Sequence, residues 1–146
     1  MLSEYHGSNN MVNKESPLDA AKKSIYALGK VTYSLGVNTT GSNATLLIPE
    51  AAEAAKAADV AIVVVGMSPC AMDGCNEGES HDRTWSSRPF GTRDVQTDNL
   101  GLPGSQQKLL AAVYKANPKT VLVLINGGAL GVDWAKEHIP AILEAF

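Results

Sequence analysis

Cysteine and histidine are scarce in this 146-residue sequence, which contains two cysteines and three histidines. Cys70 and Cys75 lie five positions apart, which allows either a small disulfide or two free thiols. A structural zinc site would need further cysteine or histidine ligands nearby. His6, His81 and His138 are dispersed and show no metal-ligand spacing. We therefore expect no metal site.

Long apolar runs and clusters of basic residues are also missing. No stretch approaches the roughly 20 apolar residues that a membrane-spanning helix needs. The net charge is −3, without a lysine or arginine cluster, which argues against a nucleic-acid or anionic-membrane surface. The first ten residues are polar and acidic, so they lack the basic end and apolar core of a secretory signal.

The motifs of several enzyme classes are absent. No Gly-x-Gly-x-x-Gly follows a predicted strand, and there is no Gly-x4-Gly-Lys-Ser/Thr loop, which argues against dinucleotide and nucleoside triphosphate cofactors. The stretch that begins at Gly66 lacks the second glycine of a nucleophile elbow, and Ser68 precedes proline. A Ser-His-Asp hydrolase is therefore not indicated, and we expect no cofactor.

The composition, with 45% hydrophobic and 18% charged residues, is typical of a globular α/β chain. Local signals divide it into alternating elements. Ser16 is expected to cap the first helix and Pro17 to begin it, and Pro49 is expected to open the second. The predicted elements are helix 16–28, strand 31–37, a helix from position 49, strand 59–66, helix 105–116, strand 120–126, helix 132–138 and a strand from position 141.

Repeated strand and helix units with short connections predict a doubly wound, mostly parallel α/β sheet with helices on both faces. Segments 59–66 and 120–126 are continuous apolar runs, which is typical of parallel strands buried on both faces. Because the sequence stops inside its last strand, we expect an incomplete α/β sandwich, with residues 1–146 forming a single partial domain. The alternative is a complete small domain with an edge strand at its end.

A loop rich in acids follows strand 59–66. Ligands of open parallel sheets bind just beyond the carboxyl ends of the strands. This loop carries Asp73, Glu77, Glu79, Asp82, His81 and Arg83. Glu79 lies between two small residues, which suits general acid/base chemistry because a substrate can approach closely. The alternative is a solvated loop in which Asp82 only pairs with Arg83. A second loop, from Asn126, should open beside this one.

Two further segments are polar. Segment 84–99 has no periodicity and predicts a surface loop insertion, since long structureless segments are uncommon inside compact domains. Asn38 and Asn43 each begin an Asn-x-Thr site to which a glycan could be attached.

Five stretches carry a resemblance to a known family. They are AADVAIVVVG, EGESHDRT, LPGSQQKL, TVLVLINGG and WAKEHIPAILEAF. In this order they resemble the C-terminal α/β-sandwich domain of glycoside hydrolase family 3, and they cover about the first two thirds of that domain.

The resemblance implies roles for particular residues. In many members of that family a glutamate of this loop, preceding an Asp-Arg pair, acts as acid/base, and that position falls on Glu79, with Glu77 as runner-up. Asp82 and Arg83 match the Asp-Arg pair, which implies loop-organising and substrate-binding roles. The aspartate nucleophile belongs to a separate TIM-like barrel domain that lies earlier in such proteins.

The resemblance therefore implies a fragment of a retaining O-glycoside hydrolase, like a β-glucosidase or β-xylosidase, that acts on β-linked glucoside or xyloside oligosaccharides in carbohydrate catabolism. Its partner would be the missing barrel, and double displacement needs a carboxyl group from each domain. We expect the isolated chain to be inactive and the parent enzyme to be secreted or extracellular. The alternative is a non-catalytic doubly wound module that binds a sugar or a nucleotide.

Overall fold

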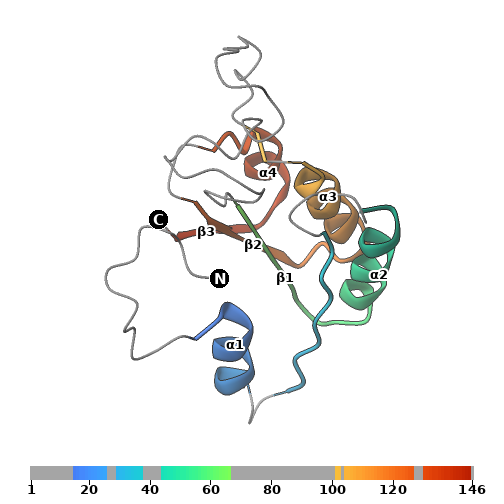
Figure 1. Ribbon diagram of the computed structural model, residues 1–146, viewed down its shortest axis with the longest axis vertical. Coiled ribbons are helices and arrows are strands. Elements are labelled where there is room, and N and C mark those ends of the chain that lie inside the picture. The colour runs from blue at the N-terminus through green and yellow to red at the C-terminus, as the bar shows by residue number, and fades with distance from the viewer. Residues whose placement is uncertain are drawn as a thin grey trace, which may run out of the picture.

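A computed structural model describes residues 15–25, 29–37, 44–66, 101–102, 104–126 and 130–145. The elements are α1 (Pro17–Ile25), α2 (Ala44–Lys56), β1 (Ala61–Gly66), α3 (Gln106–Ala116), β2 (Thr120–Ile125), α4 (Asp133–His138) and β3 (Ala141–Ala145). The strands form one parallel sheet in the order β1-β2-β3, with helices interleaved between them (Figure 1). The predicted parallel α/β architecture is confirmed.

The register of the sheet brings the carboxyl ends of the three strands level with one another. Gly66 of β1 lies opposite Ile125 of β2, which in turn lies opposite Ala145 of β3. Because Asn126 directly follows Ile125, the segments that leave β1 and β2 begin side by side, as the sequence predicts.

The core lies between one face of the sheet and the helices. Alternate side chains of a strand point to opposite faces, and in β1 those of Ala61, Val63 and Val65 point to the covered one. α2 packs along α3 above them (Figure 1). Leu110 and Leu122 are fully buried, and each such burial contributes about 1.5–3 kcal/mol. The buried apolar set is Ala51, Ala55, Ala61, Val63, Val65, Leu102, Leu109, Leu110, Val113, Leu122, Leu124, Ala135 and Ile139.

The other side chains of the strands are much more exposed. The exposed fractions are 53% for Ile62, 42% for Val64 and 60% for Leu143. In the register, Val64 lies opposite Val123, and Val123 lies opposite Leu143. These neighbouring side chains therefore form one apolar surface. The prediction that β1 is buried on both faces is therefore wrong for the described part of the chain, where the packed helices lie over one face.

Asn117 joins three elements at the amino-terminal edge of the sheet. Its side chain is buried, and Nδ2 donates to the carbonyl groups of Ala55 and Ala58, each at 2.9 Å. Oδ1 accepts from the N–H of Lys119 at 2.9 Å, and the hydroxyl of Thr120 donates to the backbone carbonyl of Asn117. The residue thus ties the end of α2 to the end of α3 and to the start of β2.

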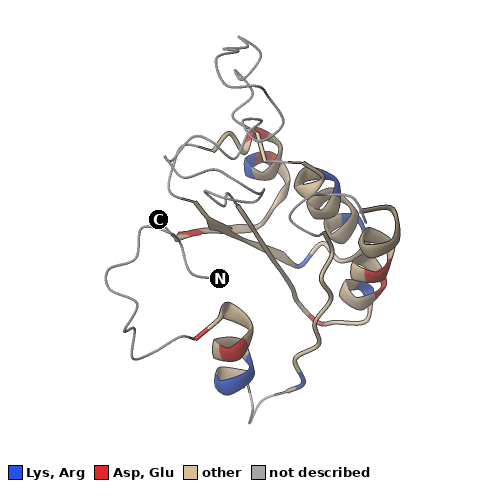
Figure 2. Ribbon diagram, in the orientation of Figure 1, with Lys and Arg blue, Asp and Glu red and all other residues tan. Residues whose placement is uncertain are grey.

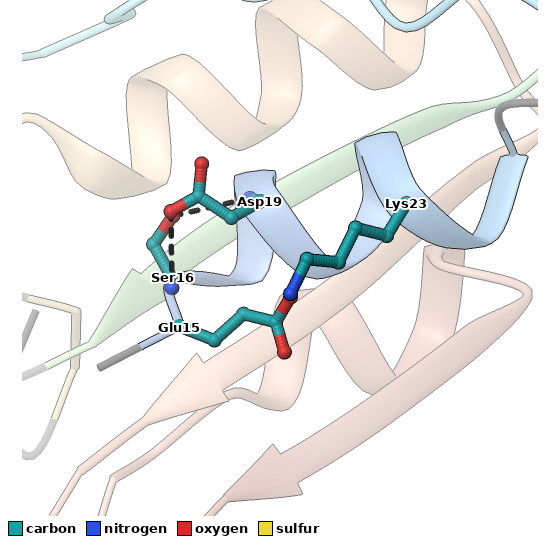
Figure 3. A network of polar contacts seen from close by, with 4 residues as sticks. All are labelled: Glu15, Ser16, Asp19 and Lys23. Carbon is teal, nitrogen blue, oxygen red and sulfur yellow. Dashed lines mark hydrogen bonds and ion pairs between the residues drawn. The ribbon is translucent and has the colours of Figure 1, made fainter. Parts of the chain in front are cut away.

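Helix α1 begins as the sequence predicts (Figure 3). The Asp19 N–H donates to Oγ of Ser16 at 3.1 Å, and Asp19 Oδ2 accepts from the N–H and the hydroxyl of Ser16. This reciprocal capping satisfies backbone donors that the first turn leaves open. The hydroxyl and N–H bonds from Ser16 hold the pKa of Asp19 below its usual value. Lys23 pairs with Glu15 at 2.6 Å, and this bond and charge raise the pKa of Lys23.

Helix α2 begins earlier than predicted. It starts at Ala44, so Pro49 lies inside the helix instead of opening it. The reason is the apolar stripe that continues upstream of the proline, since Ile48 packs against the core on the same side as Ala51 and Ala55. Burial of that stripe outweighs the backbone hydrogen bond that proline cannot make.

The predicted strand 31–37 is also wrong, because these residues lie outside the sheet. The segment ends in a tight turn in which the N–H of Val37 donates to the carbonyl of Leu35 at 2.8 Å. Gly36, with φ of 71°, allows this turn, and a Cβ there would lie 2.8 Å from the Leu109 methyl carbons. The close approach to α3 replaces the predicted strand pairing.

Replacement of Asn117 by alanine should destabilise the chain. The carbonyls of Ala55 and Ala58 and the N–H of Lys119 would lose their partner, which costs about 1–3 kcal/mol when such groups are buried. Urea unfolding should show a lower midpoint, while Lys115→Ala, an exposed change on α3, should leave it nearly unchanged. Equal midpoints for Asn117→Ala and the parent chain would contradict this role.

Candidate functional site

The carboxyl edge of the sheet is the candidate functional site, because parallel sheets bind ligands there. The sequence-predicted site residues Glu77, Glu79, Asp82 and Arg83 all lie outside the described residues, as do Cys70, Cys75, Asn38, Asn43 and segment 84–99. Their roles therefore stay predictions. The structure does describe the end of each strand at this edge and the side chains that hold it.

The acid-rich segment leaves the sheet at Gly66, where a side chain would not fit. A Cβ built on this residue would lie 1.9 Å from the carbonyl oxygen of Ile125 on the neighbouring strand. That distance is far below any van der Waals contact. Gly66 has a φ of 154°, a backbone conformation that residues with a side chain rarely adopt, so glycine is required at this point.

The backbone of Gly66 is held from the opposite side by Gln106, the first residue of α3. The N–H of Gly66 donates to Oε1 of Gln106, and Nε2 of Gln106 donates to the Gly66 carbonyl, both at 2.9 Å. The N–H of Ala61 donates to the carbonyl of Lys119, next to the first residue of β2. Because successive residues of a strand direct their backbone groups to opposite sides, the odd-numbered residues of β1 bond to β2 and the even-numbered ones face away from it. Gly66 therefore faces away from β2, toward an edge on which the described residues form no further strand, and the amide of Gln106 bonds to it there. We call these two bonds the Gln106–Gly66 clamp.

The ends of β2 and β3 are joined by Asn126 and Glu144. The buried Asn126 continues the ladder, since its N–H donates to the carbonyl of Ala145 at 3.4 Å. Its side-chain Nδ2 donates to Oε1 of Glu144 at 2.8 Å. The bond fixes a carboxylate at the carboxyl edge, two strands away from Gly66.

Gln106 and Glu144 are not among the site residues that the sequence pattern predicts. Gln106 stands in the stretch LPGSQQKL, where a polar side chain at the start of an amphipathic helix is an ordinary surface feature. Glu144 is the one acid in the apolar run AILEAF, which was a usable signal. Local pattern cannot predict either hydrogen-bonded pair, because the partners are distant in the sequence. Gln106 lies 40 residues from Gly66, and Asn126 lies 18 residues from Glu144.

Charge and aromatic side chains gather elsewhere. Acidic and basic residues lie mainly on the helices, while the strands carry little charge (Figure 2). His138 stacks on Trp134 with ring centroids 4.4 Å apart, and Tyr114 meets both rings edge-on. Nδ1 of His138 also donates to the carbonyl of Trp134 at 2.8 Å. The ring contacts of Tyr114 with Trp134 and His138 thus join α3 to α4.

Among the described residues, no group of three or more His, Cys, Asp or Glu side chains is placed to hold a metal ion. None of the described helices is both long enough and apolar enough to cross a membrane.

Comparison with known proteins places the whole chain in one group. The profile of the glycosyl hydrolase family 3 C-terminal domain matches residues 1–146. A β-xylosidase of Formosa agariphila is 33% identical over 131 residues, which are 90% of this chain. A periplasmic β-glucosidase of Salmonella typhimurium is 32% identical over 114 residues, or 78% of this chain. The chain spans only 15% and 12% of the length of these two proteins.

A solved structure has a similar fold. A β-glucosidase from Erythrobacter marinus superimposes with a TM-score of 0.63 and 28% sequence identity. The superposition covers 88% of this chain and 18% of that protein. The resemblance that the five sequence stretches indicate is thereby confirmed.

Replacement of Gly66 by alanine should destabilise the chain, because the new methyl group would overlap the Ile125 carbonyl. Forcing atoms into a packed site costs about 1–3 kcal/mol. Thermal unfolding followed by circular dichroism should show the loss. Gly29→Ala is the matched control, since its Cβ would make an ordinary 3.6 Å contact with Ile25. Similar melting curves for the two variants would show that the close approach at Gly66 is not tight.

Proposed function

Because this chain belongs to the glycosyl hydrolase family 3 C-terminal domain family, we propose that it is part of a retaining O-glycoside hydrolase and carries the enzyme's acid/base loop. The observation that carries the proposal is the family match over the entire chain. The relatives named above are β-xylosidases and β-glucosidases, so the proposed substrates are β-linked glucoside or xyloside oligosaccharides.

The proposed proton donor is Glu79, with Glu77 as the alternative. Two features support this proposal: the match of EGESHDRT to the family's loop, and the departure of that loop from the carboxyl edge of a parallel sheet. In the first step Glu79 would protonate the oxygen of the leaving group. In the second step the same carboxylate would take a proton from the attacking water.

The nucleophile would come from the separate TIM-like barrel domain. In retaining glycosidases the two carboxyl groups lie about 5–5.5 Å apart on either side of the glycosidic bond. Asp82 and Arg83 would organise the loop and contact the sugar. We further propose that the parent enzyme is secreted or extracellular, and the Salmonella typhimurium relative is named as periplasmic.

Loss of the acid/base group should affect poor leaving groups most. In the complete enzyme, Glu79→Ala should lower activity on alkyl β-glucosides by about 10²- to 10⁴-fold, the range of proton-transfer catalysis. Activated aryl glycosides should suffer less in the glycosylation step, because their phenolate leaves without a proton. Added azide, which needs no deprotonation, should rescue turnover of the covalent intermediate. Steady-state kinetics with both substrate types measures these effects.

Glu77→Ala is the matched control on the other side of Gly78, and it should behave nearly like the parent enzyme. Leaving-group dependence and azide rescue in Glu77→Ala, with normal behaviour of Glu79→Ala, would assign the acid/base to Glu77. Normal behaviour of both variants would mean that the proton donor lies outside this loop.

The isolated 146-residue chain should hydrolyse neither aryl β-glucosides nor aryl β-xylosides above the buffer rate. One carboxyl group cannot perform a double displacement, since the reaction needs a nucleophile and an acid/base on opposite sides of the glycosidic bond. Chromogenic glycosides and a purified chain suffice for this measurement. Turnover that disappears in Glu79→Gln would show that a nucleophile is present in these residues.

A further inference from the structure

The Gln106–Gly66 clamp lies where the acid-rich segment begins. Gly66 is the last residue of β1, and Glu79 follows it by 13 positions in the sequence. Both polar backbone groups of Gly66 are bonded to one side-chain amide at 2.9 Å. The orientation of the backbone at the point where the segment leaves the sheet is therefore set by Gln106.

Gly66 needs such an external constraint. Glycine has more backbone freedom than any other residue, and the nearby Ile125 carbonyl excludes a side chain that would reduce this freedom. The ladder to β2 does not supply the constraint, because the N–H and carbonyl of Gly66 point away from β2. An amide that donates and accepts at once can fix both groups, as a neighbouring strand would.

Gln106 is itself held by the core. It begins α3, whose buried side chains Leu109, Leu110 and Val113 pack among the strands. The clamp thus transmits the position of a buried helix to the start of the segment. In the register Gly66 lies opposite Ile125, but its own N–H and carbonyl point away from β2.

We propose that Gln106 is a positioning residue for the acid/base step, acting through Gly66 on the segment that carries the proton donor. The inference rests on the proposed function, in which that donor is Glu79. Its physical basis is the steep dependence of proton transfer on geometry, since a displacement of about 1 Å can cost 10²-fold in rate.

The first test compares Gln106→Ala with Gln107→Ala in the complete enzyme. Gln107 is the next residue of α3 and has the same side chain without the clamp. Gln106→Ala should lower kcat/KM for alkyl β-glucosides by about 10-fold or more. Its effect on activated aryl glucosides should be smaller, and Gln107→Ala should leave both unchanged. Equal losses on both substrates in Gln106→Ala would reduce the role to general structure and overturn the proposal.

The second variant, Gln106→Glu, keeps the shape and makes the clamp depend on pH. The ionised carboxylate can accept from the Gly66 N–H but cannot donate to its carbonyl. The protonated carboxyl group can do both, so the site favours the neutral form and should raise the pKa of the new group. The ratio of variant to parent activity on alkyl glucosides should therefore rise as pH falls below about 7 toward the ordinary glutamate range near 4.3. A ratio that is constant with pH in a folded variant would overturn the proposal.

A double variant separates this inference from the proposed function. If Gln106 acts through Glu79, then Gln106→Ala should add no leaving-group dependence in a Glu79→Ala background. Full additivity of the two changes would overturn the positioning role while leaving Glu79 as the proton donor. Parent-like kinetics of Glu79→Ala alone would overturn the acid/base assignment and, with it, the role of Gln106.

Discussion

The buried amide of Asn117 is the interaction on which the arrangement of this fold depends. A parallel sheet needs crossover helices, and each crossover leaves unpaired backbone groups where a helix ends and the next strand begins. Asn117 satisfies such groups at the ends of α2 and α3 and beside β2 with one side chain. It thereby holds the start of β2 against the residues that link α2 to β1.

At the carboxyl edge, side-chain amides again link separate elements, and there they hold the ends of strands. Gln106 and Asn126 are amides that bond across elements, one to the backbone of Gly66 and one to the carboxylate of Glu144. The first orients the start of the acid-rich segment, and the second holds a negative charge at the end of β3. Both interactions constrain strand ends at this edge, which is what a site built on loops requires of its scaffold.

Local sequence signals predict much of this fold, but they fail where contacts between residues far apart in the sequence determine the structure. Ser16 and Pro17 start α1 because capping involves residues three apart, and the apolar runs of β1 and β2 are strong enough to identify alone. Pro49 gives a wrong start for α2, because the packing of Ile48 against the core extends the helix upstream of the proline. Strand 31–37 fails because Gly36 turns against Leu109, a contact that spans more than 70 positions. The Gln106–Gly66 clamp could not be predicted for the same reason. Local chemistry makes Glu79 a candidate acid/base, and the family resemblance selects it over Glu77.

In the proposed mechanism the two carboxyl groups belong to separate domains, and this would make the base of the loop important. In a single-domain site, neighbouring strands hold both groups, and errors in their positions are correlated. Here the nucleophile would belong to the barrel, so the distance across the sugar, about 5–5.5 Å in a retaining enzyme, depends on how this domain directs its loop. If only its own residues held the loop, the distance between the two carboxyl groups would vary. In the proposed mechanism, the two hydrogen bonds at Gly66, backed by a helix buried in the core, would reduce that variation before the substrate arrives.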